Sequence, residues 1–104
     1  MSDFGKAVTA VEMALKALHL DGQIAVYMDS ETEHIVLDEA ISIARIPGNW
    51  VTGDVNAEKG SQEIFRGELV EAVTEAVVAL VAKQARRYLG EIFEAVENED
   101  GLVD

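Results

Sequence analysis

The residues best suited to chemistry are two runs of oxygen-bearing side chains whose spacing resembles the start of a calcium-binding loop. In the first run, Asp29-Ser30-Glu31-Thr32-Glu33, potential ligands stand at alternate positions. The sixth position of that run is His34, where the loop needs glycine, and the twelfth is Ala40, where a bidentate glutamate belongs. The second run, which begins at Asp54, fails the same two tests. We therefore interpret both runs as solvated turns and expect neither a metal site nor another cofactor.

Acid–base and nucleophilic chemistry find no better support. His19 and His34 are the only side chains expected to titrate near neutral pH without perturbation. His19 falls at the end of a predicted helix, where a cation complements the helix dipole, and His34 falls on a predicted hairpin among polar neighbours. The serines occupy cap, turn and strand positions, the glycines form no phosphate-binding cluster, and the chain has no cysteine. We therefore predict a protein that is not an enzyme.

The composition excludes two broad classes of acidic and nucleic-acid-binding protein. Of 104 residues, 20 are Asp or Glu and 8 are Lys or Arg, so the formal net charge is −12. Yet 49% of the residues are hydrophobic, which is more than a disordered acidic segment contains. A protein that binds nucleic-acid phosphates directly needs the opposite charge. We predict a single compact domain over residues 1–97, followed by an acidic frayed tail over residues 98–104.

The net charge is concentrated in two segments. Between Lys16 and Arg45 there are six acids and no base, and after Arg87 there are again six acids and no base. The other 8 acids and 8 bases cancel. We select as candidate partner-binding residues the acids of the hairpin segment, Asp29, Glu31, Glu33, Asp38 and Glu39, and those of the C-terminal end, Glu91, Glu94 and Glu97.

The C-terminal acids raise an electrostatic question. They are expected near the negative end of a helix dipole, where each costs about 0.3–1 kcal/mol. Two explanations are open. The helix could break at Gly90, so that these acids begin a new helix, or they could await a cationic partner. One such partner is the basic cluster Lys83, Arg86 and Arg87 of a second protomer.

Apolar periodicity predicts an α+β fold: an N-terminal helix, a three- or four-stranded antiparallel meander, and a long C-terminal helix packed on the sheet. Apolar residues from Phe4 to Leu18 are spaced 4, 3, 4 and 3 apart, which favours a helix. Residues 23–28 and 34–37 alternate and are joined by a polar turn, as in a hairpin. Residues 40–46 favour a third strand, although a helical face also fits, and residues 49–52 could form a short fourth strand.

The second helix is predicted to begin at Ser61, as its cap, and to run for about 35 residues. Its middle, residues 76–82, is apolar on every side, so we expect it to be covered on more than one side. A domain of this size has little left to cover the second side, so we predict a homodimer. The alternative is a monomer in which the first helix and the sheet cover the helix completely. The predicted interface residues are Leu69, Val73, Val77, Val78, Leu80, Val81 and Tyr88.

A cytoplasmic protein without membrane contact is the expected setting. The first residues do not resemble a secretory signal, and the longest wholly apolar run, residues 76–82, is too short for a membrane span. Our leading hypothesis is a non-enzymatic, homodimeric interaction module whose acids recognise a basic protein surface. One alternative is an inhibitor from a phage or mobile element that mimics nucleic acid. Another is a small acidic secretion-type chaperone, which the chain resembles in size, charge and order of elements.

Overall fold

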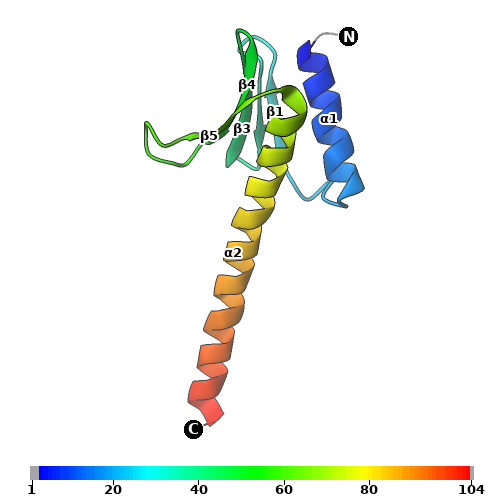
Figure 1. Cartoon of the computed structure of the whole chain (residues 1–104). Helices are drawn as coiled ribbons and strands as arrows, with labels where there is room; N and C mark the ends of the chain where they lie inside the picture. The colour runs from blue at the N-terminus through cyan, green and yellow to red at the C-terminus, as the bar shows by residue number, and fades with distance from the viewer. Residues whose placement is uncertain (1–2, 104) are drawn as a thin grey trace.

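The computed structural model describes residues 3–103, in which two helices lie on one face of a five-stranded sheet (Figure 1). The elements follow one another as α1 (Asp3–Ala17), β1 (Val26–Asp29), β2 (His34–Leu37), β3 (Ile41–Ile46), β4 (Asn49–Asp54), β5 (Glu63–Gly67) and α2 (Leu69–Val103). The predicted α+β class, N-terminal helix, antiparallel sheet and long C-terminal helix are confirmed. The number of strands is five rather than three or four.

Helix α1 forms because its apolar residues share one face, and it ends in a capped turn. Ala7, Val11 and Leu15 on that face are buried against the sheet and α2. At its end the Leu20 amide donates to the Leu15 carbonyl (2.7 Å) and the His19 amide donates to the Lys16 carbonyl (3.1 Å). This is the Schellman pattern, and His19 takes the left-handed position with φ of 58°. His19 therefore has a structural role at the helix end.

The sheet is a meander in which each strand pairs with the next in the chain, in the order β1-β2-β3-β4-β5. Residues on one face of the central strands are fully buried beneath the helices, and the residues between them are partly exposed on the opposite face. The predicted hairpin and the third and fourth strands are present in this meander, although the first hairpin strand begins at Val26 rather than at Gln23. Strand β4 is longer than predicted and ends at Asp54.

Strand β5 replaces the first turns of the predicted second helix. The segment Glu63–Gly67 pairs with β4, placing Phe65 opposite Thr52. The predicted helix start at Ser61 is therefore wrong, and α2 begins instead at Leu69. Gly67 is the last residue of β5, and Glu68 alone separates the strand from α2.

Helix α2 is one unbroken helix of 35 residues, and Gly90 lies inside it. Its first half packs on β3, β4 and β5 and beside α1, where it buries Ala72, Ala76 and Leu80 completely. The fully buried Thr52 donates its hydroxyl proton to the Ala72 carbonyl oxygen at 2.6 Å, which joins β4 to this half. The orientation of α2 on the sheet is thus set by packing and by one buried hydrogen bond.

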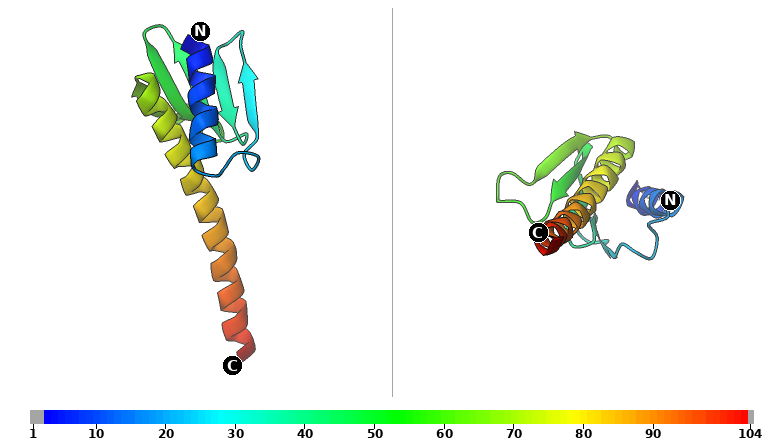
Figure 2. Two further views of the ribbon diagram at one scale, coloured as in Figure 1. Left: turned by 90° about the vertical axis from the view of Figure 1, so that its right-hand side faces the viewer. Right: turned by 90° about the horizontal axis from the view of Figure 1, so that it is seen from below.

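The second half of α2 projects away from the rest of the domain (Figures 1 and 2). The molecule measures 61 × 31 × 20 Å, and its radius of gyration is 16.6 Å. A compact chain of this length has a radius of about 13 Å. Residues 98–103, predicted to be a frayed tail, continue the helix, and residue 104 lies outside the described residues.

Candidate interaction surfaces

The five acids of the hairpin segment do not form one surface, because the meander sends them to opposite ends of the sheet. The turn between β1 and β2 carries Asp29, Glu31 and Glu33, whereas the turn between β2 and β3 carries Asp38 and Glu39. The sequence run of negative charge is therefore two separate acidic sites in the folded chain.

At the end of the sheet formed by the β1–β2 turn, Asp29 and Glu33 both have contacts within the chain. Asp29 Oδ1 accepts hydrogen bonds from the amides of Glu31 (2.9 Å) and Thr32 (3.2 Å), and the bonds from Thr32 lower the pKa of the Asp29 carboxyl most. Glu33 lies 3.6 Å from an Arg45 guanidinium nitrogen, and Arg45 also pairs with Asp3 at 3.1 Å. Among the described residues, Glu31 is the one acid of this turn whose carboxylate takes part in neither a hydrogen bond nor an ion pair, and its side chain is exposed.

His34 contacts two neighbouring side chains of the β1–β2 hairpin. The His34 Nδ1 atom and the Thr32 hydroxyl share a short hydrogen bond, and the His34 ring lies 6.5 Å from the Tyr27 ring. Among the described residues there is no group of three or more His, Cys, Asp or Glu side chains placed to hold a metal ion. The contacts of His34 are those of a side chain that rigidifies a hairpin.

At the opposite end of the sheet, Asp38 and Glu39 occupy a tight turn with unusual backbone geometry. Both have φ of 55°, and the Ala40 amide donates to the Leu37 carbonyl oxygen at 3.0 Å. Two successive left-handed residues closed by this bond form a type I′ turn, which favours Asn or Asp followed by Gly. Asp38 suits its position, whereas Glu39 stands where the stability of the turn favours glycine.

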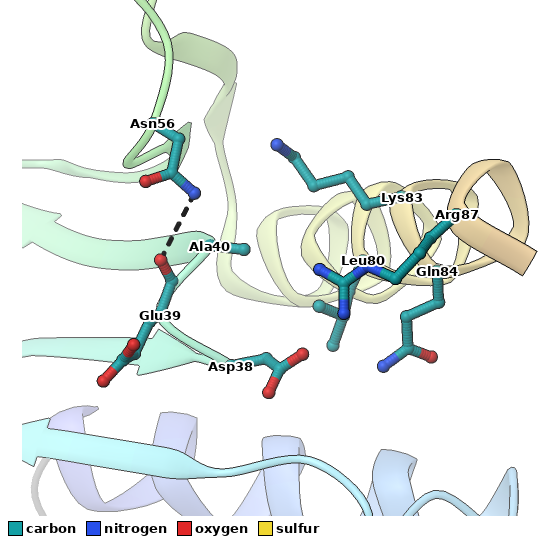
Figure 3. Close-up of a pocket in the computed structure, with 8 residues that line it drawn as sticks. All are labelled: Asp38, Glu39, Ala40, Asn56, Leu80, Lys83, Gln84 and Arg87. Carbon is teal, nitrogen blue, oxygen red and sulfur yellow. Dashed lines mark hydrogen bonds between the residues drawn. The ribbon is translucent and has the colours of Figure 1, made fainter. Parts of the chain in front are cut away.

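These two acids border a cleft of about 460 Å³ between the turn, the β4–β5 loop and α2 (Figure 3). Lys83 Nζ lies 2.9 Å from Asp54 Oδ2, and this contact is the main cause of the lowered pKa of Asp54. Asp38 and Arg87 extend into the cleft from opposite sides, whereas Glu39 points away from α2. The lining carries side chains of both charges, an arrangement that suits recognition of a polar group.

An apolar stripe of exposed side chains runs along α2, and we call it the outer stripe. Its side chains are exposed, with Tyr88 at 69%, Phe93 at 62% and Val78 at 58% of full exposure. Successive residues of an α-helix turn by about 100° around its axis. The centre of this stripe therefore lies roughly 150° around the axis from the centre of the buried residues between 72 and 80. The outer stripe consists of Val78, Val81, Ala85, Tyr88, Leu89, Ile92, Phe93 and Val96.

The predicted dimer-interface residues divide between the two sides of α2. Val73, Val77 and Leu80 are buried in the protomer's own core, and Leu69 is partly buried against it. The other three, Val78, Val81 and Tyr88, lie on the outer stripe. Ile92 and Phe93 were not among the predicted interface residues, although the spacings Tyr88 to Ile92 and Leu89 to Phe93 are the sequence signal for them.

Charges on the projecting half of α2 are separated along its length. Arg86 and Arg87 come first, and the acids Glu91, Glu94 and Glu97 follow; all five are exposed and form no ion pair with the described residues. Since α2 continues to Val103, Glu91 and Glu94 lie more than one turn before its end, where the dipole has little effect. The helix does not break at Gly90, so the first explanation for these acids is removed.

No protein-family model, curated protein or solved structure matches this chain at a significant level. Within residues 3–103, neither helix combines the length and the apolar composition that crossing a membrane requires. The features that bear on function are the outer stripe and the acidic turns between β1 and β2 and between β2 and β3.

Proposed function

We propose that the chain is a non-enzymatic, cytoplasmic protein-interaction module that works as a homodimer and presents acids to a basic partner surface. The observation that carries the proposal is the outer stripe, on a half-helix that no other described element covers (Figure 2). Exposed apolar patches of this kind are characteristic of protein interfaces. The projecting half of α2 contributes little to the core of its own domain. Association with a second protein surface explains why this half carries exposed apolar side chains.

The exposed area supports association. The chain exposes 7223 Å², whereas a compact monomer of 11.3 kDa exposes about 5,700 Å². The difference exceeds the roughly 800 Å² that each partner buries in a standard interface. The projecting helix therefore carries enough surface for a stable dimer.

The acids at the two ends of the sheet favour a partner with a basic surface. Glu39 is held in a left-handed conformation that costs stability, as is Glu33, and strained residues gather at functional sites. Asp38, the other residue of the Glu39 turn, extends into the cleft. Glu31 is exposed and without a described ion pair at the other end. Asp29 and Glu33, in contrast, have structural contacts, so we assign partner recognition to Glu31, Asp38 and Glu39.

Affinity capture from the native host tests this assignment. Immobilised protein is compared with the variant E31Q/D38N/E39Q, which removes three charges and leaves side-chain size nearly unchanged. We expect the captured partner to bind the variant about tenfold more weakly, from three exposed charge contacts of about 0.5 kcal/mol each. The control E12Q/E71Q/E75Q removes three exposed helical charges and should bind normally. Equal loss in both variants would reduce the acids to a general solubility role.

The same capture separates the two alternative functions. If duplex DNA displaces the captured protein, its basic surface is a nucleic-acid site and the chain acts as a mimic of nucleic acid. If the captured protein binds through an extended apolar segment and resists salt, a chaperone role is favoured. A partner that salt releases and DNA does not displace supports the proposed module.

A further inference from the structure

We infer that the cleft between the β2–β3 turn and α2 binds a zwitterionic small molecule, an α-amino acid with an apolar side chain. The ammonium group of this ligand lies at Asp38, its carboxylate at Arg87 and its side chain against Val81 and Tyr88. The inference goes beyond the proposed function, because it assigns a small molecule to a site within one protomer. It shares only Asp38 with the acids assigned to the partner.

Two hollows meet beside α2, and the side chains of Asp38, Gln84 and Arg87 border both. The first hollow is the cleft of about 460 Å³. The second measures about 580 Å³, and Val81 and Tyr88 also line it. Small-molecule sites usually have volumes of about 300–1,000 Å³. The three shared side chains therefore stand between a mainly polar hollow and one with an apolar wall.

The uncompensated charges that extend into the cleft are one acid and one base. Among the described residues, the side chains of Asp38 and Arg87 form no hydrogen bond and no ion pair. Lys83 is neutralised by Asp54 at 2.9 Å, and Glu39 points away from α2 (Figure 3). An anion at the guanidinium would also meet the carboxylate, and a cation at the carboxylate would also meet the guanidinium. A ligand that carries both charges satisfies the two side chains together.

There is space for a ligand between the two charged groups. Asp38 and Arg87 extend into the cleft from opposite sides, and their charged atoms are more than 4.0 Å apart (Figure 3). In an α-amino acid, one carbon carries both the ammonium and the carboxylate, so a single small molecule contacts both walls. A guanidinium group binds both oxygens of a carboxylate in a fixed geometry, which suits Arg87 to the anionic end.

Both walls of the cleft are fixed by contacts within the chain. The Asp38 amide donates to the Ala25 carbonyl oxygen at 2.7 Å. Asn56 Nδ2 donates to the Glu39 carbonyl oxygen at 3.4 Å, which holds the turn against the β4–β5 loop (Figure 3). On the other wall, an ion pair joins α2 to the end of β4. A site whose walls are already in place binds a ligand with little loss of conformational freedom.

The surface of α2 leads from the charged part of the site to an apolar part. Arg87 stands seven residues after the buried Leu80, so it lies on the side of the helix that faces the sheet. At about 100° per residue, Gln84 lies between Arg87 and Tyr88 around the helix axis. Val81 and Tyr88, which are 42% and 69% exposed, form the edge of the outer stripe nearest the cleft. This edge provides the contact for an apolar side chain of the ligand.

Nuclear magnetic resonance titrations with three related probes test the requirement for both charges. The probes are L-phenylalanine, L-phenylalaninamide, which lacks the carboxylate, and N-acetyl-L-phenylalanine, which lacks the ammonium group. We expect L-phenylalanine to shift the backbone amide signals of residues 38–40 and 80–88, with a dissociation constant of about 1 mM or less. Each probe with a single charge should bind at least about fivefold more weakly.

Two substitutions locate the charged groups. D38N keeps a residue that the type I′ turn favours, and R87Q changes an exposed side chain, so both variants should fold. Each should weaken the binding of L-phenylalanine at least about fivefold. R86Q is the matched control, since Arg86 lies about 100° around the helix from Arg87 and borders neither hollow. R86Q should bind like the wild type, and Trp50 fluorescence checks that each variant is folded.

The titration is repeated on I92D, whose charge on the outer stripe prevents a second copy from covering Val81 and Tyr88. Binding that needs both charges, in either protein, supports the inference. Absence of binding in both proteins overturns it and leaves the proposed homodimer and partner standing, because neither depends on a small ligand. Equal binding of all three probes would also overturn it, as would equal losses in R86Q and R87Q, since the cleft would then have no selectivity for a zwitterion.

Discussion

Lys83 Nζ and Asp54 Oδ2 lie 2.9 Å apart at the point where α2 leaves the sheet. Both side chains are largely shielded, and Asp54 is the last residue of β4, so the contact links the end of a core strand to the helix. Among the described residues, no ion pair joins α2 to the sheet beyond this point. The pair therefore marks the boundary between the part of α2 that belongs to the core and the part that carries the outer stripe.

Replacing Asp54 tests the contribution of this pair to stability. Because Lys83 lowers the pKa of Asp54 below its ordinary value of 3.8, the stabilisation is fully present at higher pH and is lost as the pH falls through the lowered pKa. D54N should lower the free energy of unfolding at neutral pH by less than about 1 kcal/mol. Urea titrations followed by Trp50 fluorescence at neutral and acidic pH measure this.

The matched control is E58Q, since Glu58 is an exposed acid in the loop that follows Asp54. E58Q should unfold like the wild type at both pH values. The difference between D54N and the wild type should shrink in acid, and a difference that is the same at both pH values would show that the carboxylate charge is not involved.

The hydrogen bond from Thr52 to the Ala72 carbonyl predicts a larger effect. T52V removes a buried donor and should lower the free energy of unfolding by about 1–2 kcal/mol. T74V removes a hydroxyl that bonds within the helix at an exposed position, so it should cost less than about 0.5 kcal/mol. Thermal denaturation of both variants makes the comparison, and equal effects would show that the bond between β4 and α2 contributes nothing.

Leu80 and Leu89 on α2 allow the core to be compared with the outer stripe. Leu80 is 1% exposed and Leu89 is 51% exposed. L80A should lower the free energy of unfolding by about 2–5 kcal/mol because it leaves a cavity. L89A should change it by less than about 0.5 kcal/mol at concentrations where the protein is monomeric, and should weaken the dimer instead. Chemical denaturation and analytical ultracentrifugation distinguish the two effects, and a strongly unstable L89A monomer would contradict the assignment.

Replacing the two central residues of the type I′ turn should raise the stability of the protein and weaken its binding to the partner. D38N/E39G replaces both residues by those that a left-handed turn favours, and should raise the free energy of unfolding by about 1 kcal/mol. The same variant removes two acids assigned to the partner, so capture of that partner should fall. Calorimetry and capture are run on the same preparation. A loss of stability would show that the two acids contribute contacts that outweigh the strain.

Local periodicity was enough to predict most of the fold. The alternation in β2 and β3 and the 3–4 spacing in α1 each report one buried face, so they could be recognised without tertiary information. Strand β1 has no buried residue, and both Tyr27 and Met28 are exposed. Strand β5 could not, because Ser61 resembles a helix cap and Phe65 stands four residues before Leu69. Its strand conformation comes from pairing with β4, which is a tertiary interaction.

The surfaces were harder to predict than the elements. Apolar residues surround the middle of α2, and the sequence does not say which side its own sheet will cover; the structure shows that Val77 turns inward and Val78 outward. The hairpin acids are close in sequence, yet strand reversal separates Glu31 from Glu39. Lys83 was grouped with Arg86 and Arg87 by proximity, but its position above Asp54 removes it from that cluster.

The central claim is that the outer stripes of two copies associate. Light scattering during size-exclusion chromatography, at tens of micromolar protein, measures it directly on the wild type and on I92D, which places a charge on the outer stripe. We predict twice the chain mass of 11.3 kDa for the wild type and the single chain mass for a folded I92D. A wild-type protein that elutes with the mass of one chain, or an I92D variant that remains dimeric, would contradict it.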